Sequence, residues 1–301
     1  MLENTAPLQK YPAPPASLVD LLAGTGVRFN GNKPWDIQVL SDEVYRRVLA
    51  SGSLGFGETY MDGLWECEQI DELVTRLLSY NINDKIRGWN RLRLLADFVR
   101  KNLFNPQSYR RAFQVGEQHY DIGNDVFEAM LDPTMSYSCA YWANAATLEQ
   151  AQQHKLDLIC KKLELKEGEW LLDIGCGWGG LARYAAEHYG VAVTGITVSR
   201  EQLRLARERC AGLPVNIELM DYRDLRGSFN KIVSVGMFEH VGPKNYSLFF
   251  NSIYQLLEDD GLFLLHSIGD HTTSNHSDPW IDKYIFPNSK LPSARQISTA
   301  V

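Results

Sequence analysis

An acid and a base stand side by side where a predicted strand ends. Glu239 and His240 follow the apolar run "KIVSVGM" and precede the turn residues "GPKNY". His266 stands near the end of a later apolar run, "GLFLLHSI". Ligands of parallel α/β sheets bind outside the carboxyl ends of the strands, so titratable groups in these places are typical of an active site. Taken alone, His266 reads equally as a satisfied histidine at a strand end, and His240 either lines the site or caps the following turn.

A glycine-rich turn, "LLDIGCGWGG", joins a predicted strand to a predicted helix. Gly175, Gly177 and Gly179 let the backbone turn tightly and approach a ligand beside the helix N-terminus. With Gly180 the turn also satisfies G-x-G-x-x-G, but a lone match to that dinucleotide pattern is weak. The next predicted strand ends in "GITVSREQ", without the acid that would bind a ribose. The leading acid Asp173 and the alternating glycines therefore favour S-adenosylmethionine (SAM) over a nicotinamide cofactor.

The elements that must position these residues alternate between strand and helix from about residue 114 onwards. Five runs are short, apolar and often β-branched: "EWLLDIG", "VAVTGIT", "NIELMD", "KIVSVGM" and "GLFLLHSI". Such strands, alternating with helices, indicate a parallel sheet with helices on both faces. The predicted fold class is α/β, the Rossmann-like architecture of SAM-dependent methyltransferases, over residues 114–301. The end of this domain, after the last strand, reads as irregular.

The first third of the chain carries a different pattern. Residues 1–16 are proline-rich, and we expect a disordered tail. Residues 17–103 predict a smaller, mainly helical domain, because "SDEVYRRVLASG" and "QIDELVTRLLSY" repeat apolar residues at helical spacing. We expect this domain to associate with lipid because of its basic stretch. The glycine-rich stretch "GSLGFGETYMDGLWE" between them predicts a compact turn. A last helix ends before Pro106, and residues 104–113 read as a linker.

Charge and cysteine content limit the partners. The 301-residue chain has a net charge of −7, which argues against nucleic-acid binding. Residues 85–111 nevertheless hold eight Lys/Arg and one acid, which suits either an anionic lipid surface or a solvated helix face. The five cysteines form no C-x-x-C pair, which fits a reducing compartment and no metal site. Because the sequence has neither a signal-peptide pattern nor a run of about 18 apolar residues, we expect a cytoplasmic protein with only peripheral membrane contact.

With these residues in view, the chain resembles the cyclopropane-fatty-acyl-phospholipid synthases, SAM-dependent enzymes related to the mycolic acid cyclopropane synthases. The motifs that carry the resemblance are long and particular: "HYDIGNDVF", "LDPTMSYSCAYW", "LLDIGCGWGGLARYAAE", "SVGMFEHVGPKNY" and "DPWIDKYIFPN". A generic methyltransferase would share only the glycine turn. The resemblance implies transfer of a methylene from SAM to the cis double bond of a phospholipid acyl chain, with bicarbonate as the proton acceptor.

The resemblance also implies roles for individual residues. Four positions match those that hold bicarbonate in the family: Cys139, Glu239, His266 and Ile268. The glycine turn supplies Gly175, Gly177 and Gly179 to SAM. Further positions that match the SAM site are Tyr137, Ser138, Thr197, Ser199, Gln202, Asp221 and Tyr222, and Tyr120 is a weaker match.

The partners that the resemblance implies are unsaturated phospholipid acyl chains at the inner face of the cell membrane, and a homodimer is left open. Chains of the family continue beyond the point where this one stops. We therefore expect the last strands of the sheet and one tyrosine of the bicarbonate shell to be missing here. Two alternatives stand beside the synthase: methyl transfer to a lipid without ring closure, and an inactive fragment that binds SAM or lipid without turnover.

Overall fold

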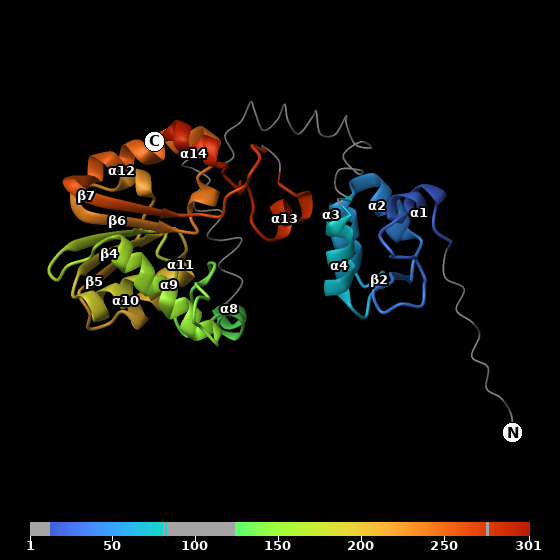
Figure 1. Ribbon diagram of the computed structural model, residues 1–301, viewed down its shortest axis with the longest axis horizontal. Helices are drawn as coiled ribbons and strands as arrows, with labels where there is room; N and C mark the ends of the chain where they lie inside the picture. The colour runs from blue at the N-terminus through green and yellow to red at the C-terminus, as the bar shows by residue number, and fades with distance from the viewer. Residues whose placement is uncertain (1–12, 81, 83–123, 275–276) are drawn as a thin grey trace, which may run out of the picture. The chain divides into compact units, whose positions relative to one another are not determined.

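The computed structural model describes residues 13–80, 82, 124–274 and 277–301. They divide into two compact units, Met1–Phe104 with Asp278–Trp280, and Asn105–Ser277 with Ile281–Val301 (Figure 1). The tail up to residue 12, the basic stretch 85–111, the linker 104–113 and Tyr120 lie outside the described residues. None of the helices within the described ranges is long and apolar enough to cross a membrane.

The N-terminal unit is mainly helical. Its elements are α1 (Ala16–Leu22), β1 (Gln38–Val39), α2 (Glu43–Ser51), α3 (Ser53–Met61), β2 (Trp65–Glu66) and α4 (Ile70–Ser79). β1 and β2 pair antiparallel. The helices α1, α2 and α4 bury apolar residues around a core that includes Leu18, Val44, Trp65 and Leu73. The helical patterns that the sequence predicts for α2 and α4 are confirmed.

The glycine-rich stretch between α2 and α4 was expected to be a compact turn, and this prediction is wrong. Residues Ser53–Met61 form the helix α3. Gly55 explains its glycine content, because a Cβ at this position would lie 2.1 Å from the backbone oxygen of Arg47 on α2. The glycine therefore permits close packing of two helices rather than a break in the chain.

The larger unit is built on five parallel strands. They are β3 (Trp170–Ile174), β4 (Ala192–Thr197), β5 (Val215–Leu219), β6 (Phe229–Val235) and β7 (Leu257–His266), in the order β5-β4-β3-β6-β7 (Figure 1). The chain runs outwards from β3 through β4 to β5, and then returns to β6 on the other side of β3. This reversal creates a topological switch point between β3 and β6, where open α/β sheets bind their ligands.

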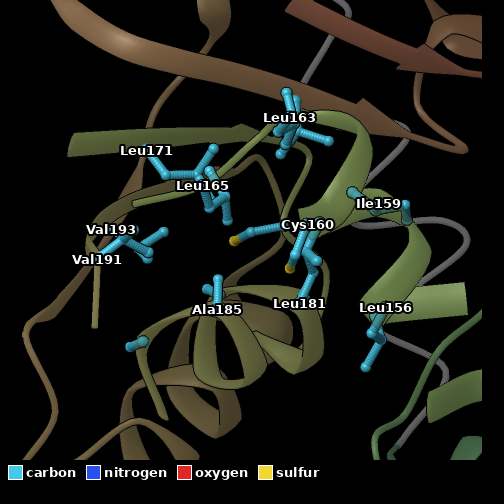
Figure 2. Close-up of a cluster of buried hydrophobic side chains, with 14 of the residues drawn as sticks. Leu156, Ile159, Cys160, Leu163, Leu165, Leu171, Leu181, Ala185, Val191 and Val193 are labelled. Atoms are coloured by element: carbon cyan, nitrogen blue, oxygen red, sulfur yellow. The ribbon is translucent and has the colours of Figure 1, made fainter. Parts of the chain in front are cut away.

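Helices cover both faces of the sheet, as predicted. On one face lie α9 (Leu148–Lys162), α10 (Gly180–Tyr189) and α11 (Arg200–Arg209), and on the other lie α12 (Tyr246–Leu256) and α14 (Ala294–Ala300). Successive strand residues point to opposite faces, so Leu171 packs with the first group of helices and Leu172 with the second. Figure 2 shows Leu171 and Val193 of the sheet meeting Cys160 of α9 in the first of these cores.

Two parts of the larger unit differ from the sequence predictions. The helix α9 was not predicted, although its last buried turns pack directly on the sheet. The segment after β7 was expected to be irregular, but it contains the short helices α13 (Pro279–Tyr284) and α14. Ser293 starts α14 with a capping box, in which its hydroxyl accepts from the backbone N–H of Gln296 and the Gln296 side chain accepts from the backbone N–H of Ser293. Seven residues with such a cap form a helix without a long apolar stripe.

Candidate active site

A cavity of about 190 Å³ opens at the carboxyl ends of the central strands of the larger unit. Its walls come from the glycine turn after β3, from the ends of β4, β5 and β6, from α9 and from the segment 135–138. The cavity therefore lies at the switch point that the strand order creates.

The three glycines of the turn have different tasks. All three have positive φ values, +82° at Gly175, +55° at Gly177 and +79° at Gly179, which residues other than glycine rarely adopt. A Cβ at Gly177 would meet nothing within 4 Å, so this backbone is open to a ligand. Gly179 does not line the cavity, and a Cβ there would lie 3.0 Å from the Cys210 sulfur. Gly175 and Gly177 can therefore contact a ligand, whereas Gly179 allows α10 to start in contact with its neighbours.

The end of β4 presents a small hydrogen-bonded group. The Thr197 hydroxyl donates to Gln202 Oε1 at 2.7 Å, and both residues line the cavity. Ser199 is the N-cap of α11, because its Oγ accepts from the Gln202 backbone N–H at 3.2 Å. Ser199 is fully buried and is not part of the cavity wall. It thus fixes the helix that carries Gln202 and does not face the ligand space.

The end of β5 carries Asp221 and Tyr222, which both line the cavity. Arg223 binds Asp221 bidentately, from Nε at 2.6 Å and from Nη2 at 2.7 Å. The same contact raises the pKa of Arg223, and burial raises the pKa of Tyr222 to about 12. Asp221 therefore stands as a carboxylate held in place by a cation, and Tyr222 offers an uncharged phenol beside it.

Asp173, the acid that precedes the glycine turn, is the most deeply buried carboxyl in the cavity wall. Its side chain is 2% exposed, and its Oδ2 has no hydrogen-bond partner within the described part of the chain. Burial raises its pKa to about 7. A buried oxygen without a partner, facing a cavity, is suited to a donor that arrives with the ligand.

The segment 135–138 forms another part of the wall and is tied to α9. The Ser138 hydroxyl accepts from Lys155 Nζ at 2.9 Å, and the Ser138 backbone oxygen accepts from Gln152 Nε2 at 3.0 Å. The Tyr137 ring lies 5.5 Å from the Phe127 ring, and burial raises the pKa of Tyr137. Tyr137, Ser138 and Lys155 all line the cavity.

Beside the cavity, Glu239 and Ile268 are in direct contact. Glu239 lies in the single turn Phe238–His240 after β6, and its Oε1 accepts from the Ile268 backbone N–H at 2.7 Å. Glu239 is 6% exposed, and its Oε2 lacks a partner among the described residues. The backbone N–H of Ile268 is therefore already used by Glu239, and one carboxylate oxygen is left over.

His266 ends β7 next to this carboxylate. Burial and the charge of Lys155 lower the pKa of His266, while Glu239 acts in the opposite direction. The imidazole is therefore uncharged at neutral pH, and its Nδ1 has no partner in the part of the chain that is described. Cys139 is exposed, and the only hydrogen bond of its thiol within the described residues is a weak one to the Ala140 oxygen at 3.6 Å.

The structure thus brings the four predicted bicarbonate positions to one region without joining them all. Glu239 contacts Ile268, and Glu239 and His266 influence each other electrostatically. Among the described residues, Cys139 is linked to the others through the field of Lys155. None of the four lines the cavity, but Ser138 and His240, their chain neighbours, do.

Sequence reasoning missed two residues on α9, Gln152 and Lys155. Both are buried, and both bind the segment that carries Tyr137 and Ser138. A signal was present in the sequence, because Lys155 falls on the same helical stripe as the apolar residues Ala151, Leu156 and Ile159. A lysine within an apolar stripe is rare unless a partner compensates its charge.

Comparison with known proteins agrees with this geometry. The family model for mycolic acid cyclopropane synthetase matches residues 107–301. The cyclopropane-fatty-acyl-phospholipid synthase of Escherichia coli is 53% identical over 279 residues, which cover 93% of this chain and 72% of the relative. A probable fatty acid methyltransferase of Pseudomonas putida is 45% identical over 61% of this chain and 50% of its own length.

A solved structure has a similar fold. Mycolic acid cyclopropane synthase CmaA1, complexed with S-adenosylhomocysteine and CTAB, aligns with a TM-score of 0.58 and 35% identity over 62% of this chain and 72% of that chain. The S-adenosylhomocysteine bound to that relative supports SAM as the cosubstrate. The chain therefore belongs to the mycolic acid cyclopropane synthetase family and is a SAM-dependent transferase.

Proposed function

We propose that this chain is a cyclopropane-fatty-acyl-phospholipid synthase, which transfers a methylene from SAM to the cis double bond of an unsaturated phospholipid acyl chain. The observation that carries the proposal is the 53% identity to the Escherichia coli synthase over 93% of the chain. The buried acid Glu239 beside the SAM cavity supports it, because ring closure needs a group that manages a proton.

The cavity residues fit SAM by type and position. The open backbone at Gly177 suits close approach of the ligand, and Asp173 offers a buried acceptor for the ammonium of the methionine part. Asp221 and Tyr222 would bind the nucleoside, with Thr197 and Gln202 beside them. Tyr137 and Ser138 would lie against the methionine part. Gly179 and Ser199 would support the site indirectly, because Gly179 shapes the turn and Ser199 caps the start of α11.

In the proposed reaction the π electrons of the alkene form a bond to the methyl carbon of SAM while the bond from that carbon to sulfur breaks. This step leaves S-adenosylhomocysteine and a carbocation on the acyl chain. A proton then leaves the new methyl group, and the electrons of that C–H bond close the ring. An alkene is a weak nucleophile, so most of the acceleration must come from positioning and from a dry site.

The proton acceptor in this proposal is bicarbonate, held by Cys139, Glu239, His266 and Ile268. The buried Glu239 Oε2 and His266 Nδ1, which have no partners within the described ranges, suit a small ligand that both donates and accepts hydrogen bonds. Bicarbonate would supply a basic oxygen there. The uncharged His266 and the carboxylate of Glu239 would orient it, and the Ile268 backbone would hold Glu239 in place.

We further propose that the enzyme works in the cytoplasm at the inner face of the cell membrane, with the basic stretch 85–111 on anionic lipid, and that a homodimer is compatible with this arrangement. Neutralising Arg91, Arg93, Arg100 and Lys101 together should weaken sedimentation with anionic vesicles at low salt. Unchanged sedimentation would show that this stretch does not contribute to binding of lipid.

The decisive test of the function uses the purified 301-residue chain, SAM and vesicles of an unsaturated phospholipid. We expect release of S-adenosylhomocysteine and a lipid that is heavier by one CH₂ and has lost its double bond. A methyl-branched lipid that keeps its double bond would indicate the methyltransferase reaction suggested by the Pseudomonas putida relative. Binding of S-adenosylhomocysteine without any turnover would identify a binding fragment.

A further inference from the structure

Lys155 is a buried cation in the wall of the cavity. Its side chain is 4% exposed, and its Nζ donates to the Ser138 hydroxyl at 2.9 Å. Within the described part of the chain no carboxylate lies within salt-bridge distance of this ammonium. A buried ammonium that has only a neutral hydroxyl as partner is rare in folded proteins, because burial of an unpaired charge is costly.

The groups around Lys155 do not neutralise it. The carboxylate of Asp132 acts on Lys155 electrostatically, but that side chain already accepts from the Thr134 N–H at 2.9 Å and the Ser136 N–H at 3.0 Å. Cys139 and His266 are the other titratable groups that interact with Lys155, and neither is a permanent anion. Burial lowers the pKa of Lys155 to about 8, and Asp132 and Cys139 offset this effect only in part. The environment of Lys155 therefore lacks one negative charge.

The anchoring of α9 fixes where this charge points. Gln152, one turn before Lys155, donates to the backbone oxygens of Ser136 at 3.2 Å and Ser138 at 3.0 Å. These bonds hold the segment 136–138 against the helix. Gly236, the residue after β6, lies beside this segment, because a Cβ built on it would be 3.6 Å from the Ser138 Cβ. Lys155 and Ser138 thus share one wall of the cavity, next to the central strands.

We propose that Lys155, together with the Ser138 hydroxyl, binds the α-carboxylate of SAM and of S-adenosylhomocysteine. The cavity then contains a cation on α9 and the buried carboxyl of Asp173 on β3, which match the two charges of an amino acid. Because the protein has already removed Lys155 from water, a carboxylate that arrives there gains a strong charge-assisted hydrogen bond. This assignment rests on SAM binding and does not depend on ring closure.

A pair of ligands isolates the contact. S-adenosylhomocysteine and its decarboxylated analogue share the adenosyl group, the sulfur and the amine, and differ in the carboxylate alone. Their dissociation constants, measured by isothermal titration calorimetry at about pH 7, should differ by about tenfold to a hundredfold in favour of S-adenosylhomocysteine. Lys155→Met should reduce this preference to about twofold or less and should leave the affinity for the analogue nearly unchanged.

The matched control is Lys161→Met on the same helix. Lys161 is exposed and pairs with Asp157 at 2.6 Å on the surface, so its loss should change neither dissociation constant. Ser138→Ala should lower the preference in part, because it removes the hydroxyl but keeps the cation. Lys155→Gln serves as a second uncharged variant if Lys155→Met does not fold.

Three outcomes would overturn the assignment. Equal weakening of both ligands by Lys155→Met would reduce Lys155 to a residue that only holds the segment 136–138. Equal affinities of the unaltered protein for the two ligands would remove the carboxylate contact regardless of any variant. A preference that survives in both Lys155→Met and Lys155→Gln would assign the carboxylate to another donor. Failure of the unaltered protein to bind S-adenosylhomocysteine at all would instead contradict its use of SAM.

Discussion

Replacement of Asp173 by asparagine should stabilise the unliganded protein at neutral pH while it weakens ligand binding. The side chain is 2% exposed, and its Oδ2 has no hydrogen-bond partner in the described residues. Asparagine has nearly the same shape but never ionises. The substitution therefore removes the cost of a buried charge and changes the packing very little.

The magnitude follows from the pKa of Asp173, which rises from 3.8 to about 7 on folding. The folded protein binds this proton more tightly than the unfolded chain, so stability is lost as the pH rises from about 4 to about 7. At about 1.4 kcal/mol per pH unit, the loss above pH 7 amounts to roughly 4 kcal/mol. An unsatisfied buried amide costs roughly 1–3 kcal/mol at every pH, so Asp173→Asn should gain at least about 1 kcal/mol above pH 7.

The assay is urea unfolding of both proteins at several pH values between about 4 and 8. The difference in the free energy of unfolding should move in favour of the variant by roughly 4 kcal/mol across this range. Asp132→Asn is the matched control, because the Asp132 carboxylate is buried but accepts from Thr134 and Ser136, and its loss should destabilise the protein. A difference for Asp173→Asn that stays constant with pH would refute the reasoning.

Three further predictions concern single residues. Glu239→Gln should leave the dissociation constant of S-adenosylhomocysteine within about twofold and reduce turnover by at least about a hundredfold. A loss of affinity as large as the loss of turnover would show that Glu239 serves SAM binding and not the proton transfer. Gly177→Ala should cost about 1–2 kcal/mol of unfolding free energy because of its positive φ and should also weaken S-adenosylhomocysteine binding. Gly63→Ala, also at positive φ with open space, should show only the stability cost, so equal binding loss in both variants would contradict a ligand contact at Gly177. His266 has a lowered pKa, so its burial should destabilise the folded protein as the pH falls below about 6.5, and His266→Gln should flatten this part of the unfolding profile measured with urea.

The parts of the fold that the sequence predicts are those that depend on neighbouring residues. The strands β3, β4 and β6 could be predicted because strands buried on both faces leave continuous apolar runs. The glycine turn could be predicted from the sequence because the positive φ at Gly175, Gly177 and Gly179 demands glycine. The same argument placed Glu239 and His266 at strand ends, and β6 and β7 pair so that Val235 lies opposite His266.

The parts that were missed depend on residues far apart in the chain. The glycines around α3 suggested a turn, because the role of Gly55 in packing against Arg47 appears only when two helices meet. The apolar stripe of α9 marks Lys155 as a buried lysine, but it does not reveal the partner Ser138, which is 17 residues away. Ser199 and Gly179 stay predicted ligand residues, but neither lines the cavity: Ser199 caps α11, and Gly179 lies against Cys210. Spacing identifies the turn, but it does not identify which member of the turn faces the cavity.

Asp173 and Lys155 are two groups of the cavity wall that lower the stability of the protein when no ligand is bound. Burial disfavours the charged form of each, and the described salt bridges do not pair one with the other. A direct ion pair would relieve both costs, but it would also remove the acceptor and the donor from the ligand. Because the groups stand apart on β3 and α9, only a ligand that carries both charges can compensate both of them. The binding free energy of such a ligand then includes the relief of two buried charges, and its binding stabilises the folded protein by linkage. The site in this way favours a zwitterionic amino acid over an uncharged nucleoside that fills the same space.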